Sequence, residues 1–524
     1  FGPVKDGKAE MYSASVSTYP DSSSSRIFLQ NLKRKTDPNK PGRYSLADLS
    51  ASDIQSKEPS FTSRQTIIRL DGGVQQIKLD RNNTEVTGFN GNTNNDTFGI
   101  VKDLGVDPDT NEWKKVLLPW TVRDSNDDGR FNAVNKEENN GKPKYSQKYR
   151  SRDNNNRDLG DIVNSPIVAV GEYLATSAND GMVHIFKKGN GDARNYSLKL
   201  SYIPGTMPRK NIENQDSTLA KELRAFAEKS YVGDRYGVDG GFVLRQVELS
   251  GKKHVFMFGA MGFGGRGAYA LDLTKIDSNN LTGVSMFDVQ NDKNNNKNDN
   301  NRVELGYTVG TPQIGKTHNG KYAAFLASGY ATKTIDDQTN KTALYVYDLE
   351  SSGTLIKKIE VPNSKGGLSS PTLVDKDLDG TVDIAYAGDR GGKMYRFDLK
   401  DWSVRTIFQG TKPITSAPAI SQLKDKRVVI FGTGSDLSEE DVDNNDIQSI
   451  YGIFDDDTAT TGTVNFSGTG GGLLEQVLKQ EGKTLFLTDY KRSDGSGDKG
   501  WVVKLKDGQR VTVKPTVVLR TAFV

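Results

Sequence analysis

The sequence contains no cysteine among its 524 residues, and it has only three histidines and four tryptophans. Without cysteine the chain forms no disulfides and no zinc–thiolate centres, and it has no thiol nucleophile. No apolar run approaches the roughly 20 residues that a helix needs to cross a bilayer. The formal net charge of +3 is too small for a chain of this size to indicate a nucleic-acid partner. These absences exclude several classes of function but leave the cellular compartment open.

Glycine is common, with 54 residues, whereas hydrophobic residues make up 34% of the chain. Spacers rich in Asn, Asp, Ser and Gly separate short apolar runs along the sequence. Frequent polar spacers of this kind favour many short strands with exposed turns over long helices. The predicted fold class is therefore all-β with long polar loops.

From Asp161 onward a unit recurs, in which three short apolar strands are joined by turns and the third strand ends in an aromatic residue or Leu followed by Asp. The aspartates that mark the clearest unit ends are Asp272, Asp348, Asp398 and Asp455. Their intervals fit a four-stranded unit of about 40 to 50 residues that carries insertions, which is typical of a β-propeller blade. The repeat therefore predicts a β-propeller.

Two regions follow from the place where the repeat begins. Residues 1–155 are predicted to form a β-rich N-terminal region that supplies the first blades and closes the propeller, or that forms a cap. Residues 156–524 are predicted to form the propeller itself. The chain starts without Met and ends on a strand-like run, so we interpret it as a fragment of a longer protein.

One helical insertion is predicted near residues 214–232. Ser217 can cap this helix, and apolar side chains fall on one of its faces. These side chains are Leu219, Leu223 and Phe226. The helix would pack on the rim of the propeller, either as structural cover or as an interaction surface.

The most distinctive stretch is the acidic loop at residues 375–383, which carries four aspartates at odd-numbered positions and one glycine, Gly380. Odd-numbered side chains of a tight loop converge on its interior, and a hard cation such as Ca²⁺ prefers their oxygens. The stretch begins like an EF-hand loop, but Tyr386 stands where a bidentate Glu is expected, and a strand follows in place of a helix. The alternative is a polar hairpin without an ion, which is disfavoured because clustered carboxylates repel one another. The predicted calcium ligands are the side chains of Asp375, Asp377, Asp379 and Asp383 and the carbonyl of Thr381.

A second, weaker calcium candidate begins at Asp124, with Asn126 and Asp128 as further ligands and Gly129 at the turn. Asn135 occupies the twelfth position, so the bidentate carboxylate of an EF-hand is missing. A calcium loop and an ion-free turn are equal alternatives for this stretch.

No pattern in the sequence supports an enzyme. Residues 262–267 fit G-x-G-x-x-G, but a strand is expected after them, so no helix N-terminus can receive a pyrophosphate. The histidines share no metal-ligand spacing, and no G-x-S-x-G elbow occurs. Paired carboxylates, as in glycoside hydrolases, are not visible in a sequence. We therefore predict no catalytic residues and no organic cofactor.

Several motifs occur in a characteristic order between residues 149 and 505. In this order the chain resembles the C-terminal propeller of the PilC/PilY family of type IV pilus-associated adhesins. The motifs are residues 159–166, 178–181, 202–205, 235–240, 264–272, 375–383, 387–392 and 431–434. Some members carry an RGD integrin motif, whereas the nearest string here is Gly388-Asp389-Arg390, so no integrin contact is carried over. The N-terminal third matches the family poorly.

The resemblance implies a modified, seven-bladed, quinoprotein-like β-propeller. It implies export to the surface of a Gram-negative bacterium, with the chain peripheral to the outer membrane or at the pilus tip. Pilin, minor pilins and a host-cell receptor are the partners that it implies. Calcium at the acidic loop would then govern pilus extension against retraction, with host-cell attachment as the wider role.

A quinoprotein-type propeller dehydrogenase is the alternative, because such enzymes share the propeller and a calcium ion. Two features disfavour it. Those enzymes carry a Trp-bearing motif in most blades, whereas this chain has four Trp in all. They also often stack a vicinal disulfide on the quinone, and this chain has no cysteine. The preferred hypothesis is therefore a non-enzymatic protein.

Overall fold

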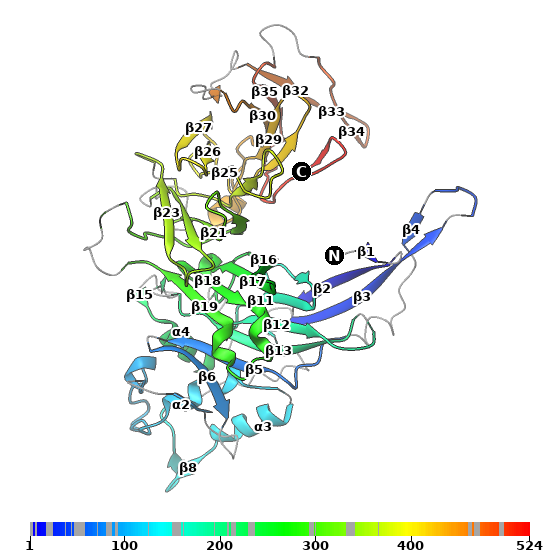
Figure 1. Cartoon of the computed structure of the whole chain (residues 1–524). Helices are drawn as coiled ribbons and strands as arrows, with labels where there is room; N and C mark the ends of the chain where they lie inside the picture. The colour runs from blue at the N-terminus through cyan, green and yellow to red at the C-terminus, as the bar shows by residue number, and fades with distance from the viewer. Residues whose placement is uncertain are drawn as a thin grey trace. The chain divides into compact units, whose positions relative to one another are not determined.

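The computed structural model in Figure 1 consists mostly of short strands, which confirms the all-β prediction. The chain divides into two compact units, Phe1–Gln290 and Asn291–Val524. Among the described residues, no helix combines the length and the hydropathy that crossing a membrane requires. The boundary predicted near residue 155 stays a prediction. The structure describes residues 4–5, 8–16, 25–36, 38–42, 44–46, 58–70, 72–79, 86–89, 93–123, 125–148, 159–160, 162–192, 194–206, 209–210, 216–228, 236–292, 298, 300–331, 341–364, 366–458, 464–465, 472–491 and 497–524.

The first unit contains two antiparallel, blade-like sheets. One has the order β10-β11-β12-β13 and continues into β5, β6 and β7, with β5 parallel to β13. The other has the order β16-β17-β18-β19. Strands from the N-terminal region thus extend a blade-like sheet. The bounds are Gln65–Leu70 (β5), Gly73–Leu79 (β6), Val86–Thr87 (β7), Val168–Val170 (β10), Tyr173–Ser177 (β11), Val183–Lys188 (β12), Tyr196–Ile203 (β13), Phe242–Leu249 (β16), Lys252–Ala260 (β17), Gly267–Asp272 (β18) and Ser285–Gln290 (β19).

Smaller elements complete the first unit. Strands β1 to β4 form a separate sheet, and β8-β9 and β14-β15 form two-stranded ribbons. Helices α2, α3 and α4 share one apolar cluster with several 3-10 turns. The bounds are Val4–Lys5 (β1), Lys8–Val16 (β2), Ser25–Thr36 (β3), Tyr44–Leu46 (β4), Asp96–Phe98 (η1), Trp113–Val116 (α2), Leu118–Trp120 (η2), Ser125–Val134 (α3), Glu138–Asn139 (β8), Lys142–Pro143 (β9), Arg209–Lys210 (β14), Asp216–Ser217 (β15), Leu219–Glu228 (α4), Gly262–Gly264 (η3), Leu273–Asp277 (η4) and Leu281–Val284 (η5).

Helix α4 is the insertion that the sequence predicts. Leu219 and Leu223 are buried in the apolar cluster, and Phe226 packs against it. The predicted cap is displaced by one residue, because Thr218 accepts the amide of Lys221 at 3.2 Å. Ser217 instead donates its hydroxyl to the Glu222 side chain at 2.8 Å. The prediction of the helix is confirmed, and its capping residue is corrected.

The second unit contains three blade-like sheets. Their orders are β20-β21-β22-β23, β24-β25-β26-β27-β31 and β28-β29-β30-β35-β32. Within the described residues no sheet closes on itself, so the ring of seven blades stays a prediction. The bounds are Gln313–Lys316 (β20), Tyr322–Ala327 (β21), Ala343–Asp348 (β22), Leu355–Glu360 (β23), Thr372–Val374 (β24), Ile384–Gly388 (β25), Lys393–Asp398 (β26), Val404–Gln409 (β27), Ala419–Gln422 (β28), Arg427–Gly432 (β29), Glu439–Val442 (α5), Ser449–Asp455 (β30), Val464–Asn465 (β31), Leu473–Gln476 (β32), Leu478–Glu481 (β33), Thr484–Leu487 (β34), Gly500–Lys504 (β35), Thr516–Val518 (β36) and Thr521–Phe523 (β37).

The four aspartates that mark the sequence repeat occupy one structural position. Each is the last residue of the third strand of its sheet, at the end of β18, β22, β26 or β30. A carboxylate at this position can accept amides of the turn that follows. Asp348 accepts the amide of Glu350 at 2.7 Å, and Asp398 accepts the amide of Lys400 at 2.9 Å. The repeat in the sequence therefore reflects a repeated turn.

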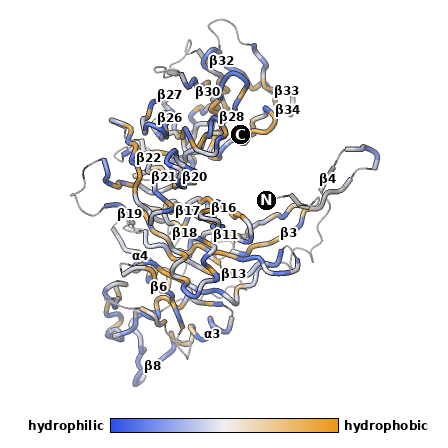
Figure 2. The backbone as a smooth tube through the Cα atoms, in the orientation of Figure 1, coloured by the Kyte–Doolittle hydropathy of each residue, from blue (hydrophilic) through white to orange (hydrophobic). Residues whose placement is uncertain are grey.

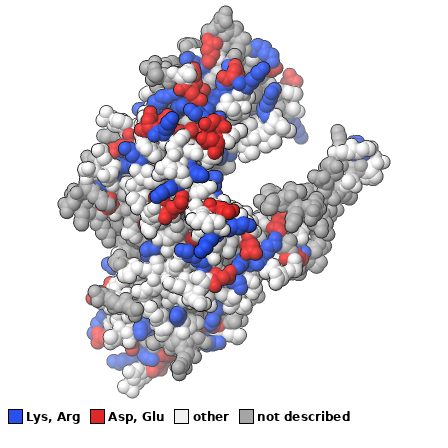
Figure 3. Space-filling model, viewed as in Figure 1, with Lys and Arg blue, Asp and Glu red and all other residues white. Residues whose placement is uncertain are grey.

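Apolar side chains fill the space between neighbouring sheets and leave charge on the surface. In the second unit, Phe325 and Val346 of one sheet share a buried cluster with Ala385 and Phe397 of the next. Figure 2 shows this pattern as hydrophobic colour along the strands. A fully buried Val or Phe side chain contributes roughly 1.5–3 kcal/mol. Figure 3 shows Lys and Arg interspersed with Asp and Glu on the outside. The packed strands thus give the loops at their ends a rigid support.

The glycine-rich stretch at residues 262–267 is a tight turn between β17 and β18. Strand β18 follows it, as the sequence predicts. A Cβ atom on Gly264 would lie 1.5 Å from the carbonyl oxygen of Gly237. Only glycine fits such a close approach of two backbones, so packing explains this part of the motif.

Candidate metal centre

The acidic loop connects β24 to β25 in the second unit and is closed at its base by the backbone. The amide of Asp383 donates to the carbonyl of Val374 at 2.8 Å. Within the loop, Leu378 and Gly380 have φ angles of 58° and 90°. Glycine adopts such left-handed angles without strain. The turn that the sequence predicts is therefore present, and β25 follows it directly.

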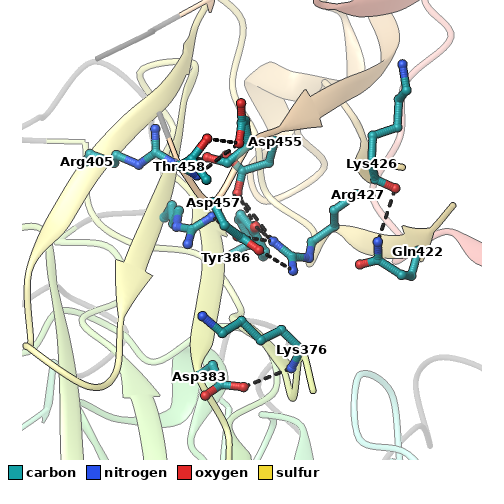
Figure 4. A network of polar contacts seen from close by, with 12 residues as sticks. Lys376, Asp383, Tyr386, Arg405, Gln422, Lys426, Arg427, Asp455, Asp457 and Thr458 are labelled. Atoms are coloured by element: carbon teal, nitrogen blue, oxygen red, sulfur yellow. Dashed lines mark hydrogen bonds and ion pairs between the residues drawn. The ribbon is translucent and has the colours of Figure 1, made fainter. Parts of the chain in front are cut away.

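Three carboxylates converge in this loop. Asp375, Asp377 and Asp383 each offer one oxygen, and these oxygens all lie within 4.8 Å of one another. The Asp383 side chain is nearly buried, with 8% exposed, whereas Asp377 is exposed. Backbone amides orient the group. The amide of Gly380 donates to Asp375 at 2.7 Å. The amide of Lys376 donates to Asp383 at 2.9 Å, as Figure 4 shows. The loop therefore holds its oxygens in a defined arrangement.

The other two predicted ligands lie in the same turn but outside this group of three. Asp379 directs its carboxylate to the backbone, where Oδ1 accepts the amide of Thr381 at 2.8 Å. The roles of Asp379 and of the Thr381 carbonyl as calcium ligands stay predictions. The structure thus separates three converging carboxylates from a fourth that stabilises the turn.

The carboxylates of the loop differ in their affinity for protons. Partial desolvation raises the pKa of Asp377, and the negative charges of Asp383 and Asp379 raise it further. The pKa of Asp375 is lowered, because desolvation acts upward but hydrogen bonds from the Gly380 amide and other neighbours outweigh it. Like charges therefore crowd around Asp377, and a bound cation would relieve this repulsion.

The donor set fits a hard cation. All three converging groups are carboxylates, and such oxygens suit Ca²⁺, which takes about six to eight oxygen ligands. Soft thiolate ligands do not occur anywhere in the sequence. Three side chains leave part of a calcium shell open, so backbone oxygens and water would complete it.

His318 is a neighbour of the site that sequence reasoning missed. It lies in the turn between β20 and β21, and its Nε2 lies 3.1 Å from Oδ1 of Asp383. The amide of Val382 also donates to the carbonyl of Lys316 at 2.9 Å, so the exit of the acidic loop is bonded to the preceding sheet. No motif connects these residues. Only the stacking of neighbouring sheets brings them together.

The second candidate differs from the loop that the sequence predicts, because the stretch forms helix α3. Asp124 and the side chain of Asp128 lie outside the described residues, and Asn126 is exposed. The buried acid of this helix is Asp127, whose Oδ2 lies 2.9 Å from Nε of Arg123. Arg123 lies just before α3, and its backbone amide also donates to Oδ2 of Asp127 at 3.2 Å, so Asp127 ties the first turn of the helix to the chain that precedes it. The predicted loop is thus corrected, and calcium binding at this stretch stays a prediction.

His184 lies in a buried hydrogen-bond chain. Its Nδ1 lies 2.8 Å from Oγ of Ser201, and its Nε2 lies 3.1 Å from Oδ2 of Asp180. Both His184 and Ser201 are fully buried. A serine nucleophile must reach its substrate, and Ser201 has no surface to offer one. The chain of contacts therefore joins the β11–β12 turn to β13 and is structural.

Comparison with known proteins gives one family and several relatives. Residues 159–491 match the family model described as PilY1 beta-propeller domain. Type IV pilus biogenesis factor PilY1 of Pseudomonas aeruginosa (strain UCBPP-PA14) is 31% identical over 57% of this chain and 29% of its own length. A PilY1 homolog of Xylella fastidiosa (strain Temecula1) is 30% identical over 66% of this chain and 26% of its own length. The chain therefore spans less than a third of the length of these relatives. The crystal structure of the Pseudomonas aeruginosa PilY1 C-terminal domain has a TM-score of 0.49 and 23% identity, over 67% of this chain and 75% of that one.

Proposed function

The chain belongs to the PilY1 β-propeller family, and on this premise we propose that it is a calcium-binding, non-enzymatic factor of type IV pilus biogenesis and adhesion. The family match confirms the resemblance that the sequence motifs indicate. The observation that carries the proposal is the convergence of three carboxylates in the β24–β25 loop, inside the matched residues. The relatives are named as type IV pilus biogenesis factors, which supports the pilus part of the proposal.

The metal would act through charge and through the geometry of one loop. Ca²⁺ bound by Asp375, Asp377 and Asp383 would offset the repulsion that raises the pKa of Asp377. Because Asp383 directly precedes β25, the ion would also fix the end of the loop against that strand. Removal of the ion would restore an exposed negative patch. Occupancy would thus change both the charge and the order of a surface loop.

The proposed partners are pilus components, namely pilin or minor pilins, and a host-cell receptor. In this proposal the protein is exported and lies at the surface of a Gram-negative bacterium, peripheral to the outer membrane or at the pilus tip. Calcium occupancy would bias the contact with a pilus component and so favour extension or retraction. Host-cell attachment follows from the position of the protein at the pilus tip.

Calorimetric titration of Ca²⁺ into the chain tests the metal site. We expect binding in the wild type and loss of binding in Asp377→Ala, because Asp377 belongs to the converging group and its side chain is exposed. Asp489→Ala is the matched control, since it removes a carboxylate with 84% of its side chain exposed at another place. Circular dichroism checks that each variant is folded.

A twitching assay tests the regulatory part. Asp377→Lys places a positive charge among the carboxylates, so we expect it to reproduce the calcium-bound phenotype in calcium-free medium. Asp489→Lys should behave like the wild type. Calcium affinity in Asp377→Ala equal to that of the wild type would reject the site. A calcium-dependent phenotype that persists in Asp377→Lys would reject the regulatory role alone.

A further inference from the structure

A second charged cluster lies where the sheet of β24 to β27 meets the sheet of β28 to β30 (Figure 4). Three arginines from three different strands point at two aspartates that follow one another closely at the end of β30. The cluster consists of Arg396 on β26, Arg405 on β27, Arg427 on β29, Asp455 at the end of β30, and Asp457. It shares no residue with the acidic loop.

The two aspartates of this cluster differ in exposure. Asp455 has 3% of its side chain exposed, accepts the hydroxyl of Tyr386 and lies 2.6 Å from Nη1 of Arg396. Asp457 has 38% of its side chain exposed and lies on the turn after β30. Asp455 is therefore a permanent part of the packed seam, whereas Asp457 approaches the arginines from the solvent side.

Asp457 occupies the position of a bound carboxylate. Its Oδ1 lies 2.7 Å from Nη1 of Arg396 and 2.6 Å from Nη1 of Arg427, and its Oδ2 lies 3.2 Å from Nη2 of Arg427. The hydrogen bonds from Arg427 and Arg396 hold the pKa of Asp457 well below its usual range. Two arginines thus donate hydrogen bonds to one planar carboxylate, which is the arrangement in which guanidinium groups recognise an acid.

The arginines have more donor capacity than the two aspartates use. Arginine stays charged in proteins, and the three guanidinium groups contact Asp455 and Asp457, while Arg405 also acts on the charge of the exposed Asp456. The Nε of Arg427 is buried without a hydrogen-bond acceptor among the described residues. Arg405 is partly exposed and, among the described residues, donates to Asp455 at 3.3 Å and to the carbonyl of Asp456 at 2.9 Å. A carboxylate that takes the place of Asp457 would therefore find hydrogen-bond donors here.

We propose that Arg396, Arg405 and Arg427 form a binding site for an acidic peptide segment of a partner protein, and that Asp457 fills this site in the free chain. Asp457 belongs to a run of three aspartates, residues 455–457, and its contacts with Arg396 and Arg427 show how one carboxylate of such a peptide would be held. Asp457 is tethered beside the arginines and competes with a free carboxylate at an effective concentration on the order of millimolar. A partner displaces it by offering several acidic groups together.

Calorimetry with a synthetic peptide tests this site. The probe is the capped tetrapeptide Asp-Asp-Asp-Thr, which copies residues 455–458, and the capped peptide Asn-Asn-Asn-Thr is its uncharged control. In Asp457→Asn the competing charge is gone and the turn keeps a similar side chain. We expect the acidic peptide to bind this variant about tenfold more tightly than the wild type. Adding Arg405→Gln to Asp457→Asn should remove that gain.

Matched controls separate this site from a general effect of charge. Asp489→Asn changes the net charge equally at an exposed position, and it should bind the peptide like the wild type. If Asp457→Asn does not fold by circular dichroism, Asp457→Ser replaces it, because Ser also suits a turn. An affinity for the acidic peptide that is unchanged in the Asp457 variant, or raised equally in Asp489→Asn, would overturn the proposal. Binding of inorganic phosphate without binding of the peptide would overturn it as well.

Discussion

The second unit holds two clusters of aspartates, and they differ in the groups that face them. In the acidic loop, carboxylates such as that of Asp377 crowd together near the surface, and partial desolvation together with repulsion raises the pKa of this residue. At the end of β30, Asp455 and Asp457 are gripped by arginines from other strands. A run of aspartates in a sequence therefore has no fixed meaning. Its role depends on whether the fold supplies cations of its own or leaves the charge for an ion from solution.

The largest effect is expected where the fold itself neutralises the charge. Asp455→Ala leaves Arg396 and Arg427 without their buried carboxylate, and breaking such a pair costs about 3–5 kcal/mol. Urea unfolding, with the same variant made at Asp377 as the comparison, measures the loss in free energy of unfolding. Without calcium, Asp377→Ala should not destabilise the chain, because it removes repulsion. Equal losses in the free energy of unfolding in Asp455→Ala and Asp377→Ala would show that the fold neutralises both aspartates to the same extent, which contradicts this comparison.

A third aspartate extends the contrast, because the Asp288 side chain is only 3% exposed yet is only partly neutralised. It accepts the hydroxyl of Tyr202 at 2.6 Å and the amide of Gly205 at 2.7 Å, and Arg69 lies 3.6 Å away. Burial raises the pKa of Asp288 to about 6, and the charge of Arg69 opposes this rise only in part. Asp288, a buried carboxylate without a close cation, thus binds protons more tightly than Asp457 does beside its arginines.

The pH dependence of unfolding follows from this raised pKa. The folded value of about 6 exceeds the unfolded value of about 3.9, so Asp288 favours folding at low pH and loses this contribution as the pH rises through about 6. Asp288→Asn does not titrate. The stability of the wild type relative to this variant should fall by on the order of 3 kcal/mol between pH 3 and pH 8. A relative stability that rises with pH would mean that Asp288, like Asp457, has a lowered pKa.

Calcium should stabilise the chain through the acidic loop alone. At a free concentration 100-fold above the dissociation constant, Ca²⁺ raises the free energy of unfolding by about 2.7 kcal/mol if one site binds only the folded state. Urea unfolding with calcium and with a chelator measures this difference. It should vanish in Asp377→Ala and persist in Asp457→Asn. Loss of the calcium effect in Asp457→Asn would indicate that the ion binds at the cluster of Asp455 and Asp457, and it would contradict a site in the acidic loop.

The smallest effect is expected at Asp379, which the structure separates from the three converging carboxylates. Asp379→Ala removes the bond to the Thr381 amide and loosens the turn without removing one of those three oxygens. We expect it to weaken calcium binding by about tenfold, in contrast to the complete loss in Asp377→Ala. Calorimetry of the two variants decides the order. A greater loss of calcium affinity in Asp379→Ala than in Asp377→Ala would support Asp379 as a calcium ligand, as the sequence predicts.

Local signals in the sequence predict local structure well. The Asp that closes each repeat, the turn at Gly380 and helix α4 each depend on residues within a few positions, and the structure contains all three. The helical cap is Thr218 in place of the predicted Ser217, a shift of one residue between two side chains that can both serve there. The ordered motifs also indicate the family, because each of them is a short local signal.

Contacts between distant strands are beyond the reach of the sequence. His318 beside Asp383 and the arginines around Asp455 come from other sheets or strands, and no spacing of residues in the sequence predicts these contacts. At α3 the aspartates and the glycine predict a loop, but the chain forms a helix whose Asp127 is bonded to Arg123, a residue just before the helix. Neutralisation of a carboxylate is a property of the packed fold, so charge patterns alone leave the two aspartate clusters indistinguishable.

The position of a bound calcium ion is the decisive observation for the acidic loop. Crystals of the chain soaked in calcium and measured for anomalous scattering reveal where the ion binds. We predict a difference peak between the carboxylates of Asp375, Asp377 and Asp383, at about 2.3–2.6 Å from their oxygens. A map with no peak in the acidic loop, or with calcium only at another place, would contradict the proposed site.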